Sequence, residues 1–394
     1  MATFPIVIIG AGMAAYSLAR EVRKRDQTTR LLIVSADSAD AYPKPMLSNA
    51  FALNKEAQQL VSHSAAQMAA QLDAEILDHT RVTAIDSARQ IIRTERGEYA
   101  YEKLVLALGA QAIRLPLAGD GADQVLSINH LDDYAGFRAQ LAKLGRPARI
   151  AILGAGLIGS EFAEDLSSAG HHVTLVDPNP RPLSALAAPA LSLGLTAAWR
   201  GRSIALQLNT SASGVYRTPS GMLEVTLGNG EKIDADIVLS AVGLRPAIAL
   251  AQAAGLSTGR GIIVDQFGQT SVPGIYALGD CAEYASAGGS AVLPYVAPLM
   301  TAARAIAATL SGTATAIAFK AEAVIVKTPS YTLALSPPLP GVNGRWSDEH
   351  DGERTVSRFI DEQGVLRGFG LSQHTPALHA SLLADLHRGV NPSA

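Results

Sequence analysis

The hydrophobic and polar positions repeat one arrangement twice along the chain. An apolar run at 5–9 ends in glycines, helical periodicity follows over 13–25, and a second apolar run occupies 31–34. The same order recurs from 149–153, with glycines, a helical segment and a further apolar run that ends at Asp177. Short apolar strands on either side of a helix are typical of parallel sheets. The pattern therefore predicts two βαβ units and an α/β fold with two Rossmann-like domains.

Two later apolar runs divide the chain. The segments 101–109 and 235–243 each read as a buried strand that ends near a glycine, where the chain leaves one domain for another. After 321 the sequence changes to an alternating hairpin and a closing amphipathic helix, which predicts a small α+β domain with the helix packed on the hairpin. The predicted domains are a discontinuous first domain at 1–112 and 245–320, a second at 113–244, and a third at 321–394.

The second glycine motif has the spacing of a dinucleotide-binding turn. Gly154, Gly156 and Gly159 permit a tight turn, close approach of a pyrophosphate, and close packing of the helix. Asp177 ends the next strand, where a carboxylate accepts a hydrogen bond from a ribose 2′-hydroxyl and repels a 2′-phosphate. The second domain is therefore predicted to bind NADH in preference to NADPH. The expected NAD contacts are Gly154, Gly156, Leu157, Ile158, Gly159, Asp177 and Gly243.

The first glycine motif is less regular. It consists of Gly10, Gly12 and Ala15, and alanine in the third place changes the helix–strand spacing little. The next strand ends in Ser35 where an acid is usual, and Asp37 lies two residues further on. Ser35 or Asp37 is expected to face the adenosine ribose, and the alternative for Asp37 is that it caps the following turn.

The segment ALGD at 277–280 distinguishes the two nucleotide sites. Gly279 and Asp280 end a strand of the first domain, where a carboxylate can bind the ribityl hydroxyls that a flavin has and NAD lacks. A helix is expected to start near Val296, with Pro298 in its first turn. Its N-terminus would stabilise negative charge on the flavin by roughly 0.3–2 kcal/mol. The first domain is therefore predicted to bind FAD.

The amino-acid composition excludes several classes of protein and of binding site. The 394 residues are 48% hydrophobic and 17% charged with a net charge of −3, which argues against a nucleic-acid-binding protein. The single cysteine, Cys281, excludes an intrachain disulfide and a paired-cysteine zinc site, and the histidines show no metal-binding spacing. The sequence shows no secretory signal and no apolar run as long as a membrane span. We therefore expect a cytoplasmic protein without a metal site, for which a monomeric state is compatible with the sequence.

Several motifs resemble those of one family. AYPKPMLSNAF (41–51), GLIGSEFAEDLSS (156–168), YALGDCAE (276–283) and VKTP (326–329) are similar to segments of the rubredoxin reductases, which are FAD-dependent pyridine nucleotide oxidoreductases. The resemblance implies FAD as prosthetic group, NADH as donor, and rubredoxin, a small iron protein, as acceptor. It implies flavin or adenine contacts from Lys44, Pro45, Val82, Glu161, Asp280, Val292 and Lys327. Together with these, the expected FAD contacts are Gly10, Gly12, Met13, Ser35, Asp37 and Gly279.

Charged residues near the flavin carry further expectations. Lys44 is expected to balance charge during hydride transfer, and Glu161 is expected to hold it in place, although a plain structural ion pair is the alternative. Lys327 lies in an apolar run and needs an anionic partner if it is buried, for which the flavin is one choice and a solvent-facing position the alternative. Because rubredoxins are acidic, Lys44, Lys320, Lys327 and Arg345 are expected to steer docking.

The resemblance implies an NADH:rubredoxin oxidoreductase that supplies an alkane hydroxylase. A hydride passes from NADH to FAD, and single electrons pass on to rubredoxin. The alternatives are a reductase of flavorubredoxin or of a ferredoxin, an NADH–quinone reductase, and an NADH sensor. An NADH oxidase, peroxidase or disulfide reductase would need a reactive cysteine near the flavin, and 41–51 contains none. Cys281 is expected to be a small buried filler, so electrons must leave directly from the flavin.

Overall fold

The computed structural model describes residues 2–286 and 289–390. Its residues cluster into two compact units, each built from three segments of the chain. The first unit comprises Met1–Pro43, Gln58–Gln111 and Leu244–Lys320, and the second comprises Lys44–Ala57, Ala112–Gly243 and Ala321–Ala394. Lys44–Ala57 therefore clusters with the second unit, whereas we predicted this segment within the first domain. The division into three domains stays a prediction.

A seven-stranded sheet forms the centre of the first unit. Its strands are β1 (Ala2–Ile9), β2 (Leu31–Val34), β3 (Ala74–Leu77), β4 (Val82–Asp86), β5 (Ile91–Thr94), β6 (Gly97–Leu106) and β17 (Ile275–Ala277). The order is β3-β2-β1-β6-β5-β4, and β17 pairs with the end of β6. The buried strands β1 and β2 run parallel, as their apolar sequences predict, whereas β4 and β5 extend the sheet in antiparallel fashion.

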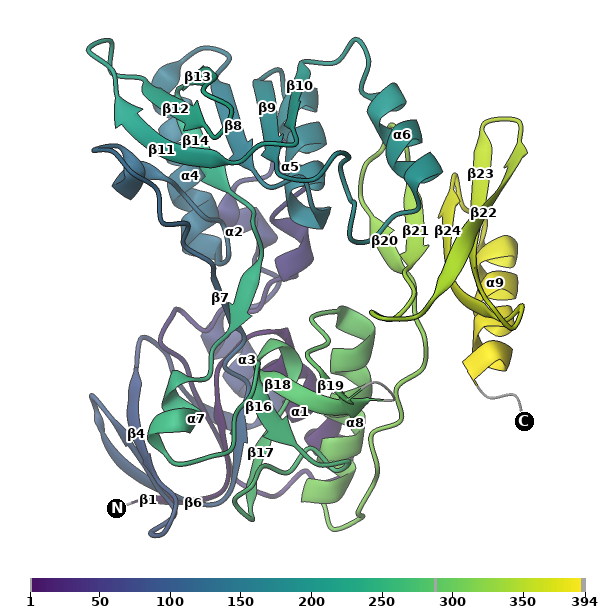
Figure 1. Cartoon of the computed structure of the whole chain (residues 1–394). Coiled ribbons are helices and arrows are strands. Elements are labelled where there is room, and N and C mark those ends of the chain that lie inside the picture. The colour runs from purple at the N-terminus through teal and green to yellow at the C-terminus, as the bar shows by residue number, and fades with distance from the viewer. Residues whose placement is uncertain (1, 287–288, 391–394) are drawn as a thin grey trace. The chain divides into compact units, whose positions relative to one another are not determined.

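Two helices of the first unit pack side by side. α1 (Met13–Arg23) begins at the first glycine turn, and α8 (Val296–Leu310) lies beside it in Figure 1. Leu18 and Val22 of α1 and Ile306 of α8 are buried in the same core as β1 and β2. Pro298 stands in the first turn of α8, as predicted. The other elements of this unit are α2 (Ala57–Leu60), α3 (Ala65–Leu72), α7 (Ala249–Ala253), β16 (Ile262–Val264), η3 (Gly279–Cys281), β18 (Ala282–Ser286) and β19 (Gly289–Ala291).

A four-stranded parallel sheet forms one part of the second unit. Its strands are β8 (Arg149–Leu153), β9 (His172–Asp177), β10 (Ile204–Leu208) and β14 (Ile237–Ser240), in the order β10-β9-β8-β14. α5 (Leu157–Ser168) connects β8 to β9, so the second predicted βαβ unit is confirmed. An antiparallel meander contributes Val225 to the core that also holds Leu153 and Val238. The meander and the remaining elements of this unit are η1 (Lys44–Met46), η2 (Ala122–Gln124), α4 (Leu131–Leu144), β11 (Ala212–Arg217), β12 (Leu223–Leu227) and β13 (Lys232–Ala235). The short strands β7 (Ala110–Ala112) and β15 (Leu244–Pro246) pair with each other at the two points where the chain changes units.

The C-terminal part of the second unit is a five-stranded antiparallel sheet between two helices. The strands are β20 (Val324–Val326), β21 (Leu333–Ser336), β22 (Gly344–Asp351), β23 (Arg354–Asp361) and β24 (Leu366–Ser372), in the order β20-β21-β24-β23-β22. α9 (Pro376–Val390) covers one face, where Leu382 and Leu386 pack on Phe369 and Leu371 (Figure 1). α6 (Pro189–Ala198) covers the other face, because a Cβ added to Gly370 would lie 2.3 Å from a methyl group of Leu191. The predicted hairpin and closing helix are therefore confirmed.

Within residues 2–286 and 289–390, no helix is both long enough and apolar enough to cross a membrane.

Candidate dinucleotide-binding sites

The glycine turn of the second unit connects β8 to α5. Gly154 has a φ of +105°, and a Cβ on Gly159 would lie 1.9 Å from the carbonyl oxygen of Gly154, so both positions require glycine. Gly156 differs, because no atom lies within 4 Å of the place where its Cβ would be. Gly156 is the N-cap of α5 and provides no side-chain hydrogen bond to the first turn. The first-turn N–H groups of α5 and the open space at Gly156 together fit a pyrophosphate.

Asp177 lies against this turn. Its Oδ2 accepts a hydrogen bond from the N–H of Ala155 at 2.7 Å, and its Oδ1 accepts from the backbone and side-chain nitrogens of Asn179, each at 2.8 Å. The side chain is buried, and these donors fix both carboxylate oxygens in orientation. Oδ2 accepts only one of these hydrogen bonds, so a ribose hydroxyl can still donate to its second lone pair. The predicted role of Asp177 toward the ribose stays a prediction that the position of the side chain supports.

The loop that follows Asp177 folds back over the glycine turn. Leu183 donates its N–H to the carbonyl oxygen of Ala155 at 2.8 Å and adopts a φ of +57°, which is uncommon for a residue other than glycine. Two residues earlier, Nε of Arg181 is buried and has no hydrogen-bond partner among the described residues. A buried donor of this kind beside the turn fits an anionic ligand. Our sequence reasoning missed Asn179 and Arg181, for which the polar run after Asp177 was the available signal.

The glycine turn of the first unit has the same construction. Gly10 has a φ of +110°, and a Cβ on it would lie 2.2 Å from the carbonyl oxygen of Ala107. Gly12 is the N-cap of α1, with no side-chain cap and nothing within 4 Å of its missing Cβ. A Cβ on Gly279 would lie 3.0 Å from Cβ of Ala14, so η3 with Asp280 lies beside the first turn of α1. The structure thus brings the first glycine turn and the ALGD segment together, and the role of this place as a flavin site stays a prediction.

Ser35 and Asp37 hydrogen-bond to each other at the end of β2. Oγ of Ser35 donates to Oδ1 of Asp37 at 2.5 Å, and the same oxygen accepts the N–H of Ala39 at 3.0 Å. Asp37 therefore caps the turn, which was the alternative to a ribose contact. The N–H of Thr80 donates to the carbonyl oxygen of Ser35 at 2.7 Å, which places the start of β4, at Val82, near this strand end. The roles of Ser35, Asp37 and Val82 toward the adenosine stay predictions.

Glu161 holds a different lysine from the one we expected. Its carboxylate lies 3.2 Å from Nζ of Lys327 and accepts the backbone N–H of Lys327 at 2.9 Å and the hydroxyl of Ser48 at 2.5 Å. Lys44 instead donates from Nζ to Oδ1 of Asn129 at 2.7 Å. The expected pairing of Glu161 with Lys44 is therefore wrong, and the anionic partner of Lys327 is a protein carboxylate. Glu161 and Lys327 are 166 residues apart, so no local pattern could have shown the pair.

Two further carboxylates of α5 bind neighbouring segments of the second unit. Asp165 accepts the N–H groups of Phe51 and Ala52 at 2.8 and 2.9 Å. Glu164 accepts the N–H of Ser330 at 2.6 Å and the indole N–H of Trp199 at 2.9 Å. Glu161, Glu164 and Asp165 are all buried, at 1%, 1% and 7% exposure. One face of α5 thus anchors both the segment after Lys44 and the turn between β20 and β21.

Asp165 makes the stability of the protein depend on pH. Burial raises its pKa from 3.8 to about 6, although its two backbone hydrogen bonds oppose this shift. Because the folded-state pKa lies above the unfolded-state value, the contribution of Asp165 to stability is full below pH 4 and is lost as the pH rises through 6. We expect the free energy of unfolding of wild type relative to Asp165→Asn to fall by roughly 2–3 kcal/mol between pH 4 and pH 7. Urea unfolding of both proteins across this range measures the difference, and parallel pH profiles would contradict the assignment.

Cys281 is fully buried in the first unit. Its Sγ lies 3.4 Å from the carbonyl oxygens of Leu106 and Leu278, and burial raises the pKa of the thiol to about 11. A thiol with this pKa stays protonated at neutral pH and is a poor nucleophile. We expect Cys281→Ala to leave NADH-dependent turnover within about twofold of wild type and to cost about 1 kcal/mol of stability. A collapse in turnover with normal flavin content would show instead that the thiol takes part in the reaction.

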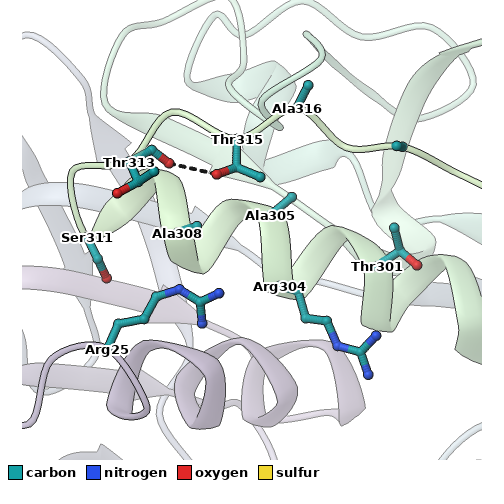
Figure 2. Close-up of a pocket in the computed structure, with 10 residues that line it drawn as sticks. Arg25, Thr301, Arg304, Ala305, Ala308, Ser311, Thr313, Thr315 and Ala316 are labelled. Atoms are coloured by element: carbon teal, nitrogen blue, oxygen red, sulfur yellow. Dashed lines mark hydrogen bonds between the residues drawn. The ribbon is translucent and has the colours of Figure 1, made fainter.

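A groove in the first unit lies between α8 and the end of α1. It has a volume of about 720 Å³, and Figure 2 shows Arg25 and Arg304 at its rim with hydroxyl groups opposite them. Arg25 is already engaged, because it donates to the carboxylate of Glu21 at 3.2 Å. The lining in the described part of the chain includes none of the predicted site residues. The groove is therefore separate from the glycine turns.

Metal-binding side chains do not gather in the part of the chain that the structure describes. Across residues 2–286 and 289–390, no three or more histidine, cysteine, aspartate and glutamate side chains form a group that could hold a metal ion.

Known proteins provide the family assignment. A family model described as pyridine nucleotide-disulphide oxidoreductase matches residues 4–309. The chain belongs to this family. A second model, described as the rubredoxin binding C-terminal domain, matches residues 316–386. Both the predicted α/β fold with a small C-terminal domain and the expected likeness to rubredoxin reductases are confirmed.

Two known proteins and one solved structure are similar to this oxidoreductase over nearly its whole length. Rubredoxin-NAD(+) reductase of Acinetobacter baylyi is 43% identical over 99% of both chains. Nitric oxide reductase FlRd-NAD(+) reductase of Aeromonas salmonicida is 38% identical over 97% of this chain and 96% of its own. The crystal structure of a covalent putidaredoxin reductase–putidaredoxin complex matches with a TM-score of 0.88 and 25% identity, covering 98% of this chain and 94% of that one.

The predicted site residues of this oxidoreductase fall into both units. The first unit holds Gly10, Gly12, Met13, Ser35, Asp37, Val82, Gly279, Asp280 and Val292. The second unit holds Lys44, Pro45, Glu161, Lys327 and all of the expected NAD contacts, including Leu157, Ile158 and Gly243. Within the first unit the glycine turn and Asp280 come together, and within the second unit the turn and Asp177 do. The flavin contacts expected of Lys44, Pro45, Glu161, Val292 and Lys327 stay predictions.

Proposed function

We propose that the chain is an FAD-dependent NADH:rubredoxin oxidoreductase. The observation that carries the proposal is the match of residues 316–386 to the rubredoxin binding C-terminal domain, directly after a pyridine nucleotide oxidoreductase region at 4–309. The similarity to the rubredoxin-NAD(+) reductase of Acinetobacter baylyi, at 99% coverage of both chains, supports it. In this reaction NADH is the electron donor and rubredoxin is the acceptor.

The first unit is proposed to hold FAD. The open space at Gly12 and the uncapped N-terminus of α1 fit its pyrophosphate. Asp280, which η3 places beside α1, would accept hydrogen bonds from the ribityl hydroxyls. When bound, FAD supplies the capacity to accept a hydride from NADH and to release electrons one at a time.

The second unit is proposed to hold NADH. The open space at Gly156 and the uncapped N-terminus of α5 fit the pyrophosphate, and Arg181 would add a charged donor. Asp177, fixed by Ala155 and Asn179, would accept a ribose hydroxyl and repel the additional phosphate of NADPH. The geometry therefore favours NADH as the donor.

The single buried thiol supports direct transfer to a carrier protein. Cys281 has no cysteine partner in the chain, and burial keeps it protonated. No dithiol is available to store an electron pair, so the chain serves to bind and orient the two nucleotides and the acceptor. Because NADH is supplied in the cytoplasm, we place the reaction there, with an alkane hydroxylase as the consumer of reduced rubredoxin.

Flavorubredoxin is the second acceptor to consider. The chain is 38% identical to the nitric oxide reductase FlRd-NAD(+) reductase of Aeromonas salmonicida, which is close to its identity with the rubredoxin relative. A comparison of kcat/KM with NADH for rubredoxin, flavorubredoxin and ferredoxin separates these acceptors. We expect rubredoxin to give the highest value by at least about tenfold, which corresponds to about 1.4 kcal/mol. A higher value for flavorubredoxin or ferredoxin would replace rubredoxin as the proposed acceptor.

A further inference from the structure

We propose that the groove between α1 and α8 is a binding site for a small organic phosphate of the size of a nucleoside diphosphate. It lies wholly within the first unit, because Arg25 belongs to Met1–Pro43 and the other lining residues belong to Leu244–Lys320. Its volume of about 720 Å³ is in the usual range of small-molecule sites, roughly 300–1,000 Å³. This site is additional to the two dinucleotide-binding sites and does not depend on the proposed function.

A reversal of the chain after α8 builds one wall of the groove. Gly312 adopts a φ of +92°, and the segment 313–318 then runs back along the helix (Figure 2). The N–H of Ile317 donates to the carbonyl oxygen of Gln266 at 2.7 Å, and the side chain of Ile317 packs against the core of the first unit. The returning segment is therefore fixed in place and forms a wall beside α8.

Small apolar side chains line the inside of the groove. Ala305 and Ala308 are buried residues of α8, and Ala316 and Ala318 are exposed residues of the returning segment. None of these four side chains extends beyond a methyl group, so they leave room for a flat body. A base or another ring would bury apolar surface against them.

Two arginines make the groove positive. Arg304 of α8 is exposed and has no ion pair or side-chain hydrogen bond with a described residue. Arg25 uses only Nη1 to contact Glu21, and that carboxylate is shared with Nζ of Lys24, 2.7 Å away. Residues 20–26 contain four basic and two acidic side chains. Because no carboxylate is among the described residues that line the groove, its charge favours an anion.

The donors around the groove favour a phosphate. A guanidinium group donates two parallel hydrogen bonds to phosphate oxygens. The hydroxyls of Thr301, Ser311 and Thr313 also line the groove, and none of them hydrogen-bonds to another described residue. Figure 2 shows Ser311 on the side of α8 that faces Arg25. A phosphate has more acceptor oxygens than a carboxylate, so it can use both arginines and these hydroxyls while its organic body lies on the alanines.

Calorimetric titration of the FAD-loaded protein tests this site. ADP is the probe, pyrophosphate is the same anion without an organic body, and adenosine is the body without phosphate. We expect ADP to bind with a Kd below about 1 mM, pyrophosphate at least about tenfold more weakly, and adenosine without measurable heat. Equal affinity for ADP and pyrophosphate would contradict an organic ligand, and equal affinity for ADP and adenosine would contradict a phosphate.

Variants of the groove locate the bound probe. Arg304→Ala removes an exposed side chain from a helix, so we expect normal folding and at least about tenfold weaker ADP binding. Arg304→Lys keeps the charge without the planar fork and should weaken binding about threefold. Ala316→Phe fills the groove from an exposed position, and it should weaken ADP at least about tenfold while leaving pyrophosphate within about twofold. The matched control is Arg89→Ala, which alters an exposed arginine of the first unit that also contacts a nearby carboxylate.

The glycine turn of the second unit supplies the competing location for ADP. Binding there would be lost in Gly156→Ala and kept in Arg304→Ala, which would overturn the groove as the site. ADP affinity unchanged in both Arg304 variants, or an equal loss in Arg89→Ala, would overturn it as well. Reduction of the flavin by NADH should stay within about twofold of wild type in the Arg304 and Ala316 variants. Loss of that reduction in the wild-type protein would refute the proposed function and leave the titration of the groove unaffected.

Discussion

Replacing Gly156 by alanine is expected to raise the KM for NADH at least about tenfold while leaving the free energy of unfolding within about 1 kcal/mol of wild type. The φ and ψ of Gly156, −74° and −164°, suit any residue, and no atom lies within 4 Å of the added Cβ. The methyl group would therefore cost little in the free protein. It would occupy the space that we assign to the pyrophosphate. NADH-dependent ferricyanide reduction and urea unfolding measure the two effects.

Gly159 supplies the matched control for that prediction. A Cβ on Gly159 would lie 1.9 Å from the carbonyl oxygen of Gly154, so Gly159→Ala must displace α5 from its strand. We expect this variant to lose at least about 1–3 kcal/mol of stability, which is the usual cost of overpacking a core. An unchanged KM in Gly156→Ala, with normal folding, would show that the nucleotide does not approach the backbone at this turn.

Replacing Glu161 by alanine is expected to lower the free energy of unfolding by about 2–4 kcal/mol. The carboxylate is 1% exposed, and its loss would leave the Lys327 ammonium, the Lys327 N–H and the Ser48 hydroxyl without their acceptor. Removing one partner of a buried ion pair typically costs about 3–5 kcal/mol. Lys327 is 30% exposed and can still be hydrated, which places the expected loss toward the lower end. Urea unfolding with an unchanged m-value measures it.

A double-mutant cycle provides the control for Glu161. Lys327→Met removes the cation, so Glu161→Ala should cost less in that background, with a coupling of about 1–3 kcal/mol. Ser48→Ala removes only a hydroxyl and should cost about 1 kcal/mol. Additive losses in the cycle would mean that the 3.2 Å contact between Glu161 and Lys327 contributes nothing to stability.

Local patterns were sufficient to predict the nucleotide-binding turns. The glycine spacings at 10–15 and 154–159, and the apolar strands before them, are properties of neighbouring residues, and the structure realises both βαβ units. Gly279 and Asp280 were predicted to end a strand of the first domain, and the structure places them at the end of β17, which pairs with β6 of the same sheet as β1.

Long-range partnerships could not be predicted in the same way. The sequence places Lys44–Ala57 next to the first βαβ unit, but Asp165 binds the N–H groups of Phe51 and Ala52 and helps to place this segment in the second unit. Glu161 finds Lys327 rather than Lys44, because the turn after β20 delivers Lys327 to the buried face of α5. Such pairs depend on how separate elements pack, and neither composition nor spacing reports that.

The most direct test of the proposed function is anaerobic stopped-flow mixing of the holoenzyme with NADH and then with oxidised rubredoxin. We expect NADH to bleach the flavin absorbance and rubredoxin to restore it at a rate no slower than steady-state turnover, with both electrons of each NADH recovered in reduced rubredoxin. A flavin that stays oxidised with NADH, or one that is reduced and then passes no electrons to rubredoxin, would contradict the proposed function.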